Sequence, residues 1–153
     1  MKKTNWWIII GFIIFTELIG FLSGYLTGNS REITMMLKQP ALSPPSWVFP
    51  IVWPILYALM AIAAFLAYDK SRKSITLCYY GVQLFLNFSW SIVFFRWGML
   101  WGSVLVIILL DLSVLTTMYH FNRYSKIAKK IMIPYLIWIL FATYLNIHIA
   151  LIN

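Results

Sequence analysis

Residues 47–68 read WVFPIVWPILYALMAIAAFLAY, and this uninterrupted apolar run decides the class of fold. The run contains no charged residue. Crossing the hydrocarbon core of a bilayer takes about 20 residues of helix, since each residue advances a helix by about 1.5 Å. Because the run is continuous rather than alternating, and much longer than a barrel strand, it predicts a membrane-spanning α-helix.

Four further apolar runs of similar length lie along the chain: 6–26, 75–95, 99–119 and 131–152. Of the 153 residues, 62% are hydrophobic and 10% are charged, and the mean hydropathy is +0.83. A soluble domain carries about 25% charged residues, so this chain has too few to cover a water-facing surface. The sequence predicts an all-α, polytopic integral membrane protein, a five-helix transmembrane bundle in a single domain over 1–153.

The first apolar run also has some features of a signal peptide, because Lys2 and Lys3 precede it. The run continues to Leu26, however, and Glu17 interrupts it. The apolar region of a signal peptide spans only about 7–15 residues. An uncleaved first membrane span therefore fits the sequence better.

The cations are unevenly divided between the two sides of the expected membrane. The N-terminus and the connections at 69–74 and 120–130 carry nine Lys and Arg, whereas the long loop 27–46, the turn 96–98 and the C-terminus carry three. Cytoplasmic segments carry the excess of Lys and Arg. We expect a multi-pass protein of the cell membrane with its N-terminus in the cytoplasm, and with loop 27–46 and the C-terminus outside.

The net positive charge of the chain is compatible with two kinds of binding partner, nucleic acids and lipid headgroups. The cations form short clusters between apolar runs rather than one basic surface. This arrangement favours contact with anionic lipid headgroups in the bilayer, and no nucleic-acid partner is expected.

Residues with metal-binding or nucleophilic chemistry are few and scattered. Cys78 is the single cysteine, so neither an internal disulfide nor a cysteine metal cluster is expected. His120 and His148 fall at opposite ends of their spans, which excludes one metal shared between them. No base is placed by spacing beside Ser91 or Ser103. We expect no metal, no resident cofactor and no conventional catalytic site.

Polar residues in the middle of apolar spans are costly and therefore informative. They are Glu17, Gln83, Asn87, Asp111 and Asn146. Hydrogen bonding between helices explains them as well as a functional site does, and the sequence does not choose between these readings. Small residues also recur at helical spacing, with Gly20, Gly24 and Gly28 four apart, which predicts close helix packing within one bundle or between subunits.

Aromatic residues are the most prominent feature, with eight Trp, nine Tyr and eleven Phe. Helical spacing places three sets of residues on one helix face each: Phe49, Trp53 and Tyr57; Asn87, Trp90 and Phe94; and Trp138, Ala142 and Leu145. The small side chain of Ala142 beside Trp138 leaves room for a flat apolar ligand. Ordinary bundle packing, or contact with lipid, is the alternative explanation of these faces.

Three stretches carry a resemblance to a known family. They are PPSWVFPIVWPILY at 44–57, QLFLNFSWS at 83–91 followed by Phe94 and Phe95, and PYLIWILFATYLN at 134–146. In these motifs, in length and in the long first loop, the chain resembles the TspO/MBR family of tryptophan-rich sensory proteins and translocator proteins, also called peripheral benzodiazepine receptors. The resemblance extends over nearly the whole chain and is closest to bacterial members.

The resemblance implies a five-helix bundle, usually a homodimer, with a cavity closed by the first loop. It implies binding of tetrapyrroles such as protoporphyrin, and of synthetic benzodiazepine-site ligands. In bacterial members it implies light- and oxygen-dependent breakdown of the porphyrin. Carried over to this sequence, the ligand-binding residues are Phe49, Trp53, Tyr57, Asn87, Trp90, Phe94, Trp101, Trp138, Ala142 and Leu145.

Within that set, the resemblance and the redox chemistry of indole make Trp53 and Trp138 the candidates for photochemistry. Arg31 and Lys38 of the long loop are candidates to meet the ligand's carboxylates. One departure concerns sterols: the cholesterol motif proposed for vertebrate members needs a Tyr followed by Lys or Arg, and the stretch LNIHIAL at 145–151 has neither. We therefore expect no cholesterol site there.

Several functions stay open at this level. The first is a membrane protein that binds protoporphyrin and promotes its photo-oxidative degradation, or that senses or transports tetrapyrroles. The alternative is a transporter, a carrier or a regulatory membrane scaffold without chemistry of its own. Five spans do not divide into two equal inverted halves, which argues against the common inverted-repeat transporter plan.

Overall fold

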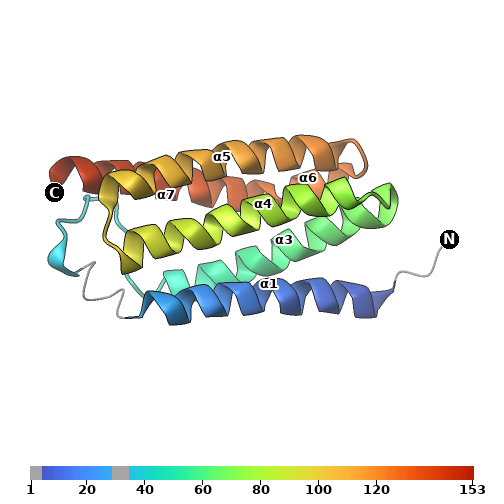
Figure 1. Cartoon of the computed structure of the whole chain (residues 1–153), viewed down its shortest axis with the longest axis horizontal. Helices are drawn as coiled ribbons and strands as arrows, with labels where there is room; N and C mark the ends of the chain where they lie inside the picture. The colour runs from blue at the N-terminus through green and yellow to red at the C-terminus, as the bar shows by residue number, and fades with distance from the viewer. Residues whose placement is uncertain (1–4, 29–34) are drawn as a thin grey trace.

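The computed structural model describes residues 5–28 and 35–153, and in those ranges it is built of helices (Figure 1). The helices are α1 (Trp6–Thr27), α3 (Phe49–Ser71), α4 (Ser74–Ser91), α5 (Leu100–Asn122), α6 (Lys126–Ile131) and α7 (Ile133–Ile152). A π-helical turn, η1 (Ile92–Arg96), continues α4.

Five helical segments are long and apolar enough to cross a membrane, with α4 and η1 forming one and α6 and α7 forming another. This confirms the predicted number of spans and the multi-pass, all-helical fold. The predicted ends differ from the observed ones, because α3 continues to Ser71 and α5 to Asn122. An apolar run marks the part of a helix that lies in hydrocarbon, whereas backbone hydrogen bonding carries the helix on beyond it.

Two predicted span boundaries need correction. The second span does not begin at Trp47, which lies in a turn with 65% of its surface exposed, but at Phe49. The last span is interrupted at Met132, just before Pro134 enters the first turn of α7. Proline lacks the backbone N–H that would bond one turn back, so a break at this point is expected.

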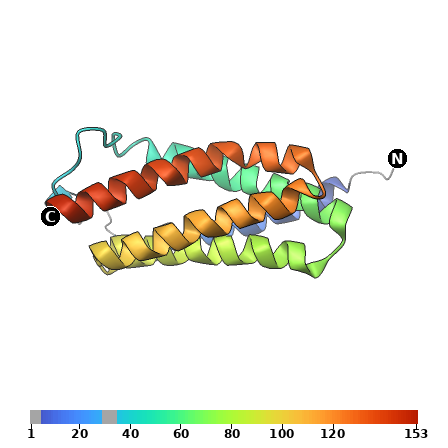
Figure 2. The same ribbon diagram turned by 90° about the horizontal axis from the view of Figure 1, so that it is seen from above.

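The helices run side by side and give the bundle two distinct ends (Figures 1 and 2). One end, here called the basic end, holds the start of α1 and the connections α3–α4 and α5–α6. The opposite end, here called the loop end, holds the first loop between α1 and α3 and the tight turn between η1 and α5. Gly98 takes a positive φ of 62° in that turn, a conformation that glycine adopts at little cost. Helices α4 and α5, which this tight turn connects, pack against each other and run antiparallel.

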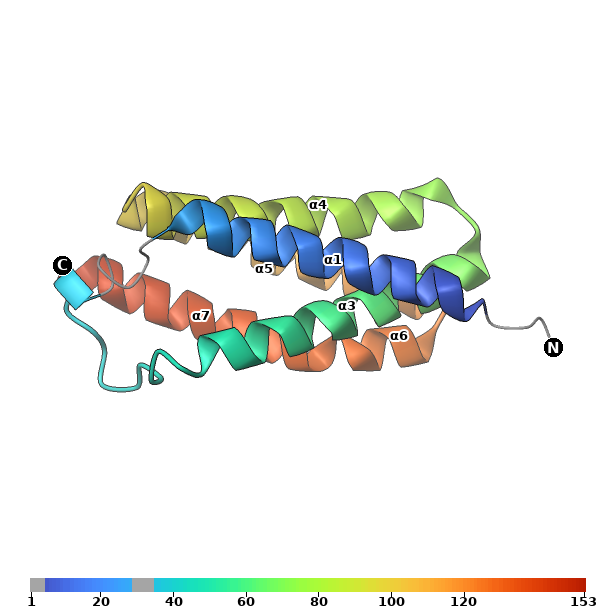
Figure 3. The same ribbon diagram turned by 90° about the horizontal axis from the view of Figure 1, so that it is seen from below.

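Helix α3 contacts every other spanning segment and lies beside α1 and α6 in Figure 3. Its alanines Ala61, Ala63, Ala64 and Ala67 are at most 1% exposed. Small side chains let helix backbones approach closely, which is how helices in lipid gain packing energy. The outer faces of the five spans keep large apolar side chains exposed, as a lipid-facing surface requires.

Candidate functional site

Five aromatic side chains from three helices meet in one place, here called the ring cluster: Phe49, Trp53 and Tyr57 of α3, Trp90 of α4 and Trp138 of α7. Trp53 is its centre, with ring centroids 5.6 Å from Tyr57, 6.2 Å from Trp90 and 6.4 Å from Trp138. Phe49 lies 5.9 Å from Trp138. Helical spacing predicted which residues share a helix face. The structure shows that these faces of α3, α4 and α7 point toward one another.

The ring cluster continues toward the loop end along α4 and η1. The Phe94 ring stacks on Trp90 at 6.1 Å, and Phe95 meets Trp90 edge-on at 5.9 Å. Phe94 belongs to the π-helical turn, where one extra residue per turn changes the direction of the side chains that follow. The π turn therefore lets consecutive residues, Phe94 and Phe95, both reach Trp90.

A row of buried polar groups supports the ring cluster from the side of the basic end. The Tyr57 hydroxyl donates to Asn87 Oδ1 at 2.8 Å, and Asn87 Nδ2 donates to the Tyr135 hydroxyl at 3.0 Å. The Tyr135 hydroxyl in turn donates to Gln83 Oε1 at 3.0 Å. Because these groups satisfy each other in an apolar surrounding, they hold α3, α4 and α7 in one register.

A second polar chain orients Trp90. Its indole Nε1 donates to Asn146 Oδ1 at 2.8 Å, and Asn146 Nδ2 donates to the Ser103 hydroxyl at 2.9 Å. Ser103 Oγ donates to the backbone carbonyl of Leu100 at 2.7 Å. Trp90 is only 6% exposed, so this hydrogen bond fixes its ring plane against Trp53.

Trp138 differs from Trp90 because its indole N–H is buried and meets no hydrogen-bond acceptor among the described residues. Leaving a buried donor unpaired costs about 1–3 kcal/mol. A ligand that offers a carboxylate or a ring nitrogen at this point would remove that cost. The ring cluster therefore contains an unused donor of the kind that binding sites place for a ligand.

The remaining members of the predicted set are arranged around these rings. Ala142 stands one turn after Trp138 on α7 and is half-buried, and Leu145 is buried. Phe49, Trp53 and Trp138 are also half-buried, so the ring cluster is open on the side of α3 and α7. The rings touch each other directly, and a flat ligand has to separate them to enter.

Trp101 stands apart from the other predicted ligand residues. Its side chain is 61% exposed on α5, and no ring contact joins it to the ring cluster in the described part of the chain. The first turn of α5 places Trp101 on the outer surface of the bundle, whereas Ser103 of the same turn faces inward. The structure thus joins seven of the ten predicted residues by direct contacts, places Ala142 and Leu145 further along α7, and leaves Trp101 outside.

The first loop is attached to the bundle at the end of α7. The Lys38 backbone N–H donates to Asn153 Oδ1 at 2.9 Å, and Asn153 Nδ2 donates back to the Lys38 carbonyl at 3.1 Å. Pro40 is buried and Leu37 packs against the core. Arg31, the other cation predicted to meet ligand carboxylates, lies outside the described residues.

The polar residues predicted at depth have different environments. Gln83, Asn87 and Asn146 are at most 2% exposed and make the interhelical hydrogen bonds above. Asp111 accepts from the Thr143 hydroxyl at 2.7 Å through Oδ2, while its Oδ1 is buried without a partner among the described residues. Glu17 is only partly buried on α1, one residue after Thr16, which pairs with the Tyr80 hydroxyl.

Tyr135 is the main residue of the site that sequence reasoning missed. Its side chain is fully buried and links Asn87 to Gln83. Its spacing of three residues from Trp138 places it on the same helix face, so that spacing was the available signal. Phe95 had no such signal, because only the π turn brings it to Trp90.

The chain is similar to known proteins over most of its length. Residues 12–152 match the TspO/MBR family. The chain is 34% identical over 151 residues to the tryptophan-rich protein TspO of Archaeoglobus fulgidus, a match covering 95% of this chain and 96% of that protein. It is 36% identical over 121 residues to protein CrtK of Rhodobacter capsulatus, covering 76% of each chain. It is 27% identical over 147 residues to the human translocator protein, covering 92% of this chain and 87% of that one.

These matches extend over most of the chain and include all three aromatic motifs from which the resemblance was inferred. That inference is confirmed: the chain belongs to the TspO/MBR family of membrane proteins.

Proposed function

We propose that this protein binds a porphyrin such as protoporphyrin at the ring cluster and promotes its light- and oxygen-dependent degradation. The observation that carries the proposal is the unpaired indole N–H of Trp138, buried beside Trp53 in a cluster open toward α3 and α7. A porphyrin is a flat apolar disc with carboxylates at one edge. Aromatic faces suit the disc, and the free donor suits a polar atom of the ligand.

Binding requires the rings to move apart, because Trp53 and Tyr57 are stacked in the described state. Trp53 and Trp138 are the two that can do so, since both are half-buried and no hydrogen bond to another described residue holds either indole. Trp90 is held by Asn146 and serves as the fixed wall of the site. Closure around the ligand would keep water from the disc, with the first loop tied at Lys38 and Asn153.

The chemistry of this proposal needs no acid–base pair in the protein. Light supplies the energy and dioxygen is the oxidant, while the protein holds the disc in one orientation toward dioxygen. An indole in contact with an excited porphyrin can donate an electron to it, which gives Trp53 and Trp138 their proposed role. Synthetic benzodiazepine-site ligands, also flat and aromatic, would compete for the same cluster.

The test follows purified protein in detergent micelles with protoporphyrin, in light and in the dark. Quenching of tryptophan fluorescence reports binding, and the absorption spectrum reports conversion. Trp53→Phe and Trp138→Phe keep an aromatic ring but remove the indole. Trp7→Phe is the matched control, because Trp7 is 83% exposed at the start of α1 and makes no ring contact with the cluster.

The proposal expects saturable quenching and a new absorbing product that forms only in light with the unchanged protein and with Trp7→Phe. Trp53→Phe should bind the pigment and convert it more slowly. Trp138→Phe should bind it more weakly, because the indole donor is gone, and should also convert the bound pigment more slowly. Trp101→Phe should behave like the control, because Trp101 lies outside the cluster. Pigment loss at the rate of empty micelles would refute the degradation step.

A carrier or sensor is the second candidate function. It is favoured by the closed state of the cluster, since the rings must open and close for each ligand, and by the names of the relatives, a translocator protein and a tryptophan-rich sensory protein. This function predicts saturable binding without a light-dependent product. The same experiment therefore separates the two candidates.

A further inference from the structure

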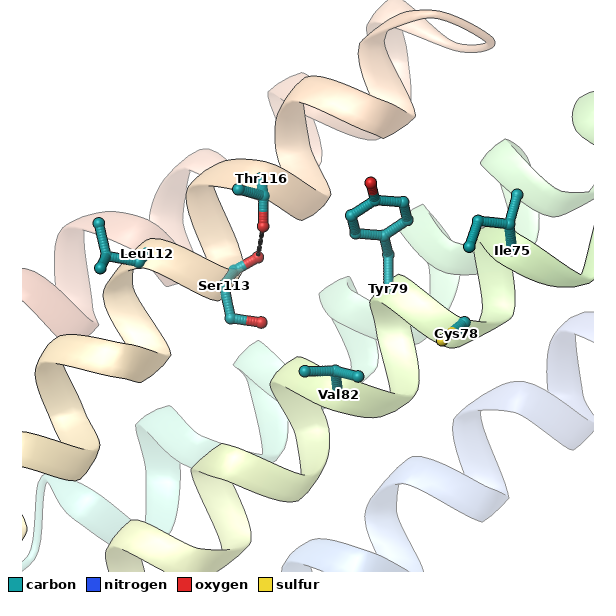
Figure 4. Close-up of a pocket in the computed structure, with 7 residues that line it drawn as sticks. All are labelled: Ile75, Cys78, Tyr79, Val82, Leu112, Ser113 and Thr116. Atoms are coloured by element: carbon teal, nitrogen blue, oxygen red, sulfur yellow. Dashed lines mark hydrogen bonds between the residues drawn. The ribbon is translucent and has the colours of Figure 1, made fainter.

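A groove lies on the outer surface between α4 and α5, away from the ring cluster (Figure 4). Its volume is about 330 Å³, and its lining consists of Ile75, Cys78, Tyr79, Val82, Leu112, Ser113 and Thr116. Most of these side chains are apolar and exposed, so the groove faces the hydrocarbon of the bilayer. A groove of this kind accepts a flexible apolar chain.

Polar groups line the middle of this groove, between Leu112 at one end and Ile75 at the other (Figure 4). The lining residues Tyr79, Ser113 and Thr116 carry hydroxyls (Figure 4). The Thr116 hydroxyl donates to the Ser113 carbonyl at 2.9 Å, so its proton is already used within α5. The Tyr79 ring stacks on His120 at 4.5 Å, and the Tyr79 hydroxyl points toward the basic end.

Two cations stand beyond these hydroxyls at the basic end. Arg123 follows Thr116 and Tyr119 on the same face of α5, and its guanidinium lies over the Tyr119 ring at 5.1 Å. Lys73 directly precedes α4 and lies over the Tyr124 ring at 5.9 Å, and that ring is 5.3 Å from His120. The contacts Tyr79–His120–Tyr124 thus connect the groove to Lys73, and Arg123 directly precedes Tyr124 in the chain.

Among the described residues, no acid forms an ion pair with either cation. The one ion pair that the structure records for residues 5–28 and 35–153 joins Arg72 to Asp69. Lys73 and Arg123 are exposed, and they lie at the ends of their membrane spans. The phosphates of a bilayer lie at the ends of such spans. An anion at this end of the groove would meet two positive charges.

We propose that the α4–α5 groove is a binding site for an anionic phospholipid of the phosphatidylglycerol type. One acyl chain lies in the groove along Val82 and Leu112, and the phosphate lies between Lys73 and Arg123. A second copy of this chain is the less suitable occupant. Two copies in one membrane would bring their basic ends together, and Asp69, the acid at this end among the described residues, already pairs with Arg72.

A second groove provides an internal comparison. It has a volume of about 270 Å³ at the loop end of α4 and is lined by Phe85, Phe88, Ser89, Ile92, Val93 and Trp97. The cation next to it, Arg96, donates to the Leu26 carbonyl at 2.8 Å and ties η1 to α1. This groove should therefore take acyl chains without selecting a charged headgroup.

The test counts bound lipids by native mass spectrometry, with phosphatidylglycerol and phosphatidylcholine of identical acyl chains titrated into detergent-solubilised protein. Removing one cation near a membrane surface should weaken binding of an anionic lipid about fivefold. We expect this loss for phosphatidylglycerol in Lys73→Gln and in Arg123→Gln, with phosphatidylcholine unchanged. Val82→Trp should fill the groove and weaken binding of both lipids.

Two matched controls accompany these variants. Lys126→Gln with Lys129→Gln removes two exposed cations of α6 at the same end, and Val93→Trp fills the other groove. Both should keep the preference for phosphatidylglycerol. Equal binding of the two lipids by the unchanged protein, or an equal loss in the α6 control, would overturn the proposal.

Cys78 tests the competing occupant, because it is exposed in the groove and is the single cysteine of the chain. A short bis-maleimide should leave the protein monomeric if lipid occupies the groove. A high yield of Cys78–Cys78 cross-link, abolished by Val82→Trp without any change in lipid binding, would identify the groove as an interface between copies and refute the lipid site.

Discussion

Gly20 is not a residue of the ring cluster, but it determines where the Tyr57 ring of that cluster can lie. A Cβ at this position would clash with the Tyr57 ring, so α1 packs directly on that ring only because Gly20 has no side chain. Tyr57 in turn positions Trp53 by stacking and Asn87 by hydrogen bonding. Of the glycines predicted to allow close packing, Gly20 does so within the bundle, whereas Gly24 faces open space.

Gly20→Ala should displace the Tyr57 ring and weaken its bond to Asn87. We expect a loss of about 1–3 kcal/mol in stability, as for other overpacked cores, together with weaker porphyrin binding. Thermal unfolding in detergent and fluorescence quenching measure the two effects. Gly24→Ala is the matched control and should be neutral; an equal loss there would show that helix flexibility, not the Tyr57 contact, is responsible.

Tyr135→Phe removes the hydroxyl that accepts from Asn87 and donates to Gln83. Because both partners are buried, the variant should lose about 1–2 kcal/mol of stability, measured by thermal unfolding. Tyr144→Phe on the same helix is the comparison. Its hydroxyl pairs with His148 at the exposed surface, so its removal should change stability little. An equal loss of stability in the two variants would mean that the buried hydrogen bonds of Tyr135 stabilise the protein no more than the surface pair of Tyr144 and His148 does.

At the scale of elements, irregular backbone is concentrated around the site. The π turn η1 directs Phe94 and Phe95 to Trp90. Pro54 lies inside α3 next to Trp53 and cannot donate a backbone hydrogen bond, which loosens the first turns of that helix. Helices α3 and α7 both begin with proline near their first positions. These departures from regular helix are located where the ring cluster has to open.

The pairing of Lys38 with Asn153 should control how fast the first loop moves. Asn153→Ala removes two hydrogen bonds, so the Lys38 backbone N–H should exchange with solvent roughly tenfold faster. Bound porphyrin should also leave faster, with little change in stability. Hydrogen exchange and stopped-flow fluorescence measure these rates. Asn122→Ala, an exposed asparagine at the opposite end, should change neither; unchanged Lys38 exchange in Asn153→Ala would contradict the role of the pair.

At the scale of the whole molecule, charge and hydropathy divide the protein into two ends and an apolar middle. The connections at the basic end carry Lys70, Lys73, Arg123, Lys126 and Lys129, and the loop end is poor in cations. Acidic residues are few in the sequence. Asp111 is buried between α5 and α7, and Asp69 forms an ion pair with Arg72 at the basic end. This division is the basis for the predicted orientation, with the basic end in the cytoplasm.

Cysteine labelling in intact cells tests the orientation. In a Cys78→Ser background, Leu42→Cys in the first loop should react with a membrane-impermeant maleimide. Lys129→Cys at the basic end should react only after the cells are opened. Both positions are exposed, so access to the side chain itself is not limiting. Labelling of Lys129→Cys in intact cells would reverse the predicted orientation.

The sequence by itself determined the number of spans, the lipid-facing composition and the sets of residues that share a helix face. These follow from local rules, since about 20 apolar residues cross a bilayer and side chains repeat with helical period. Membership of the family followed from three motifs whose residues are close in sequence. Site residues were predictable where they belonged to such a set, as Trp53, Trp90 and Trp138 did.

Only the tertiary structure decided how each helix is rotated about its axis and which faces meet. That rotation puts Trp101 on the outer surface and buries Tyr135 fully, although both lie in the first turn of an apolar helix. It also leaves the Trp138 N–H unpaired, ties Lys38 to Asn153 across more than a hundred residues and creates the groove beside Cys78. In lipid, apolar residues gain nothing by facing inward, so hydrophobicity does not specify rotation; close packing at Gly20 and the buried hydrogen bonds of Asn87 and Asn146 do.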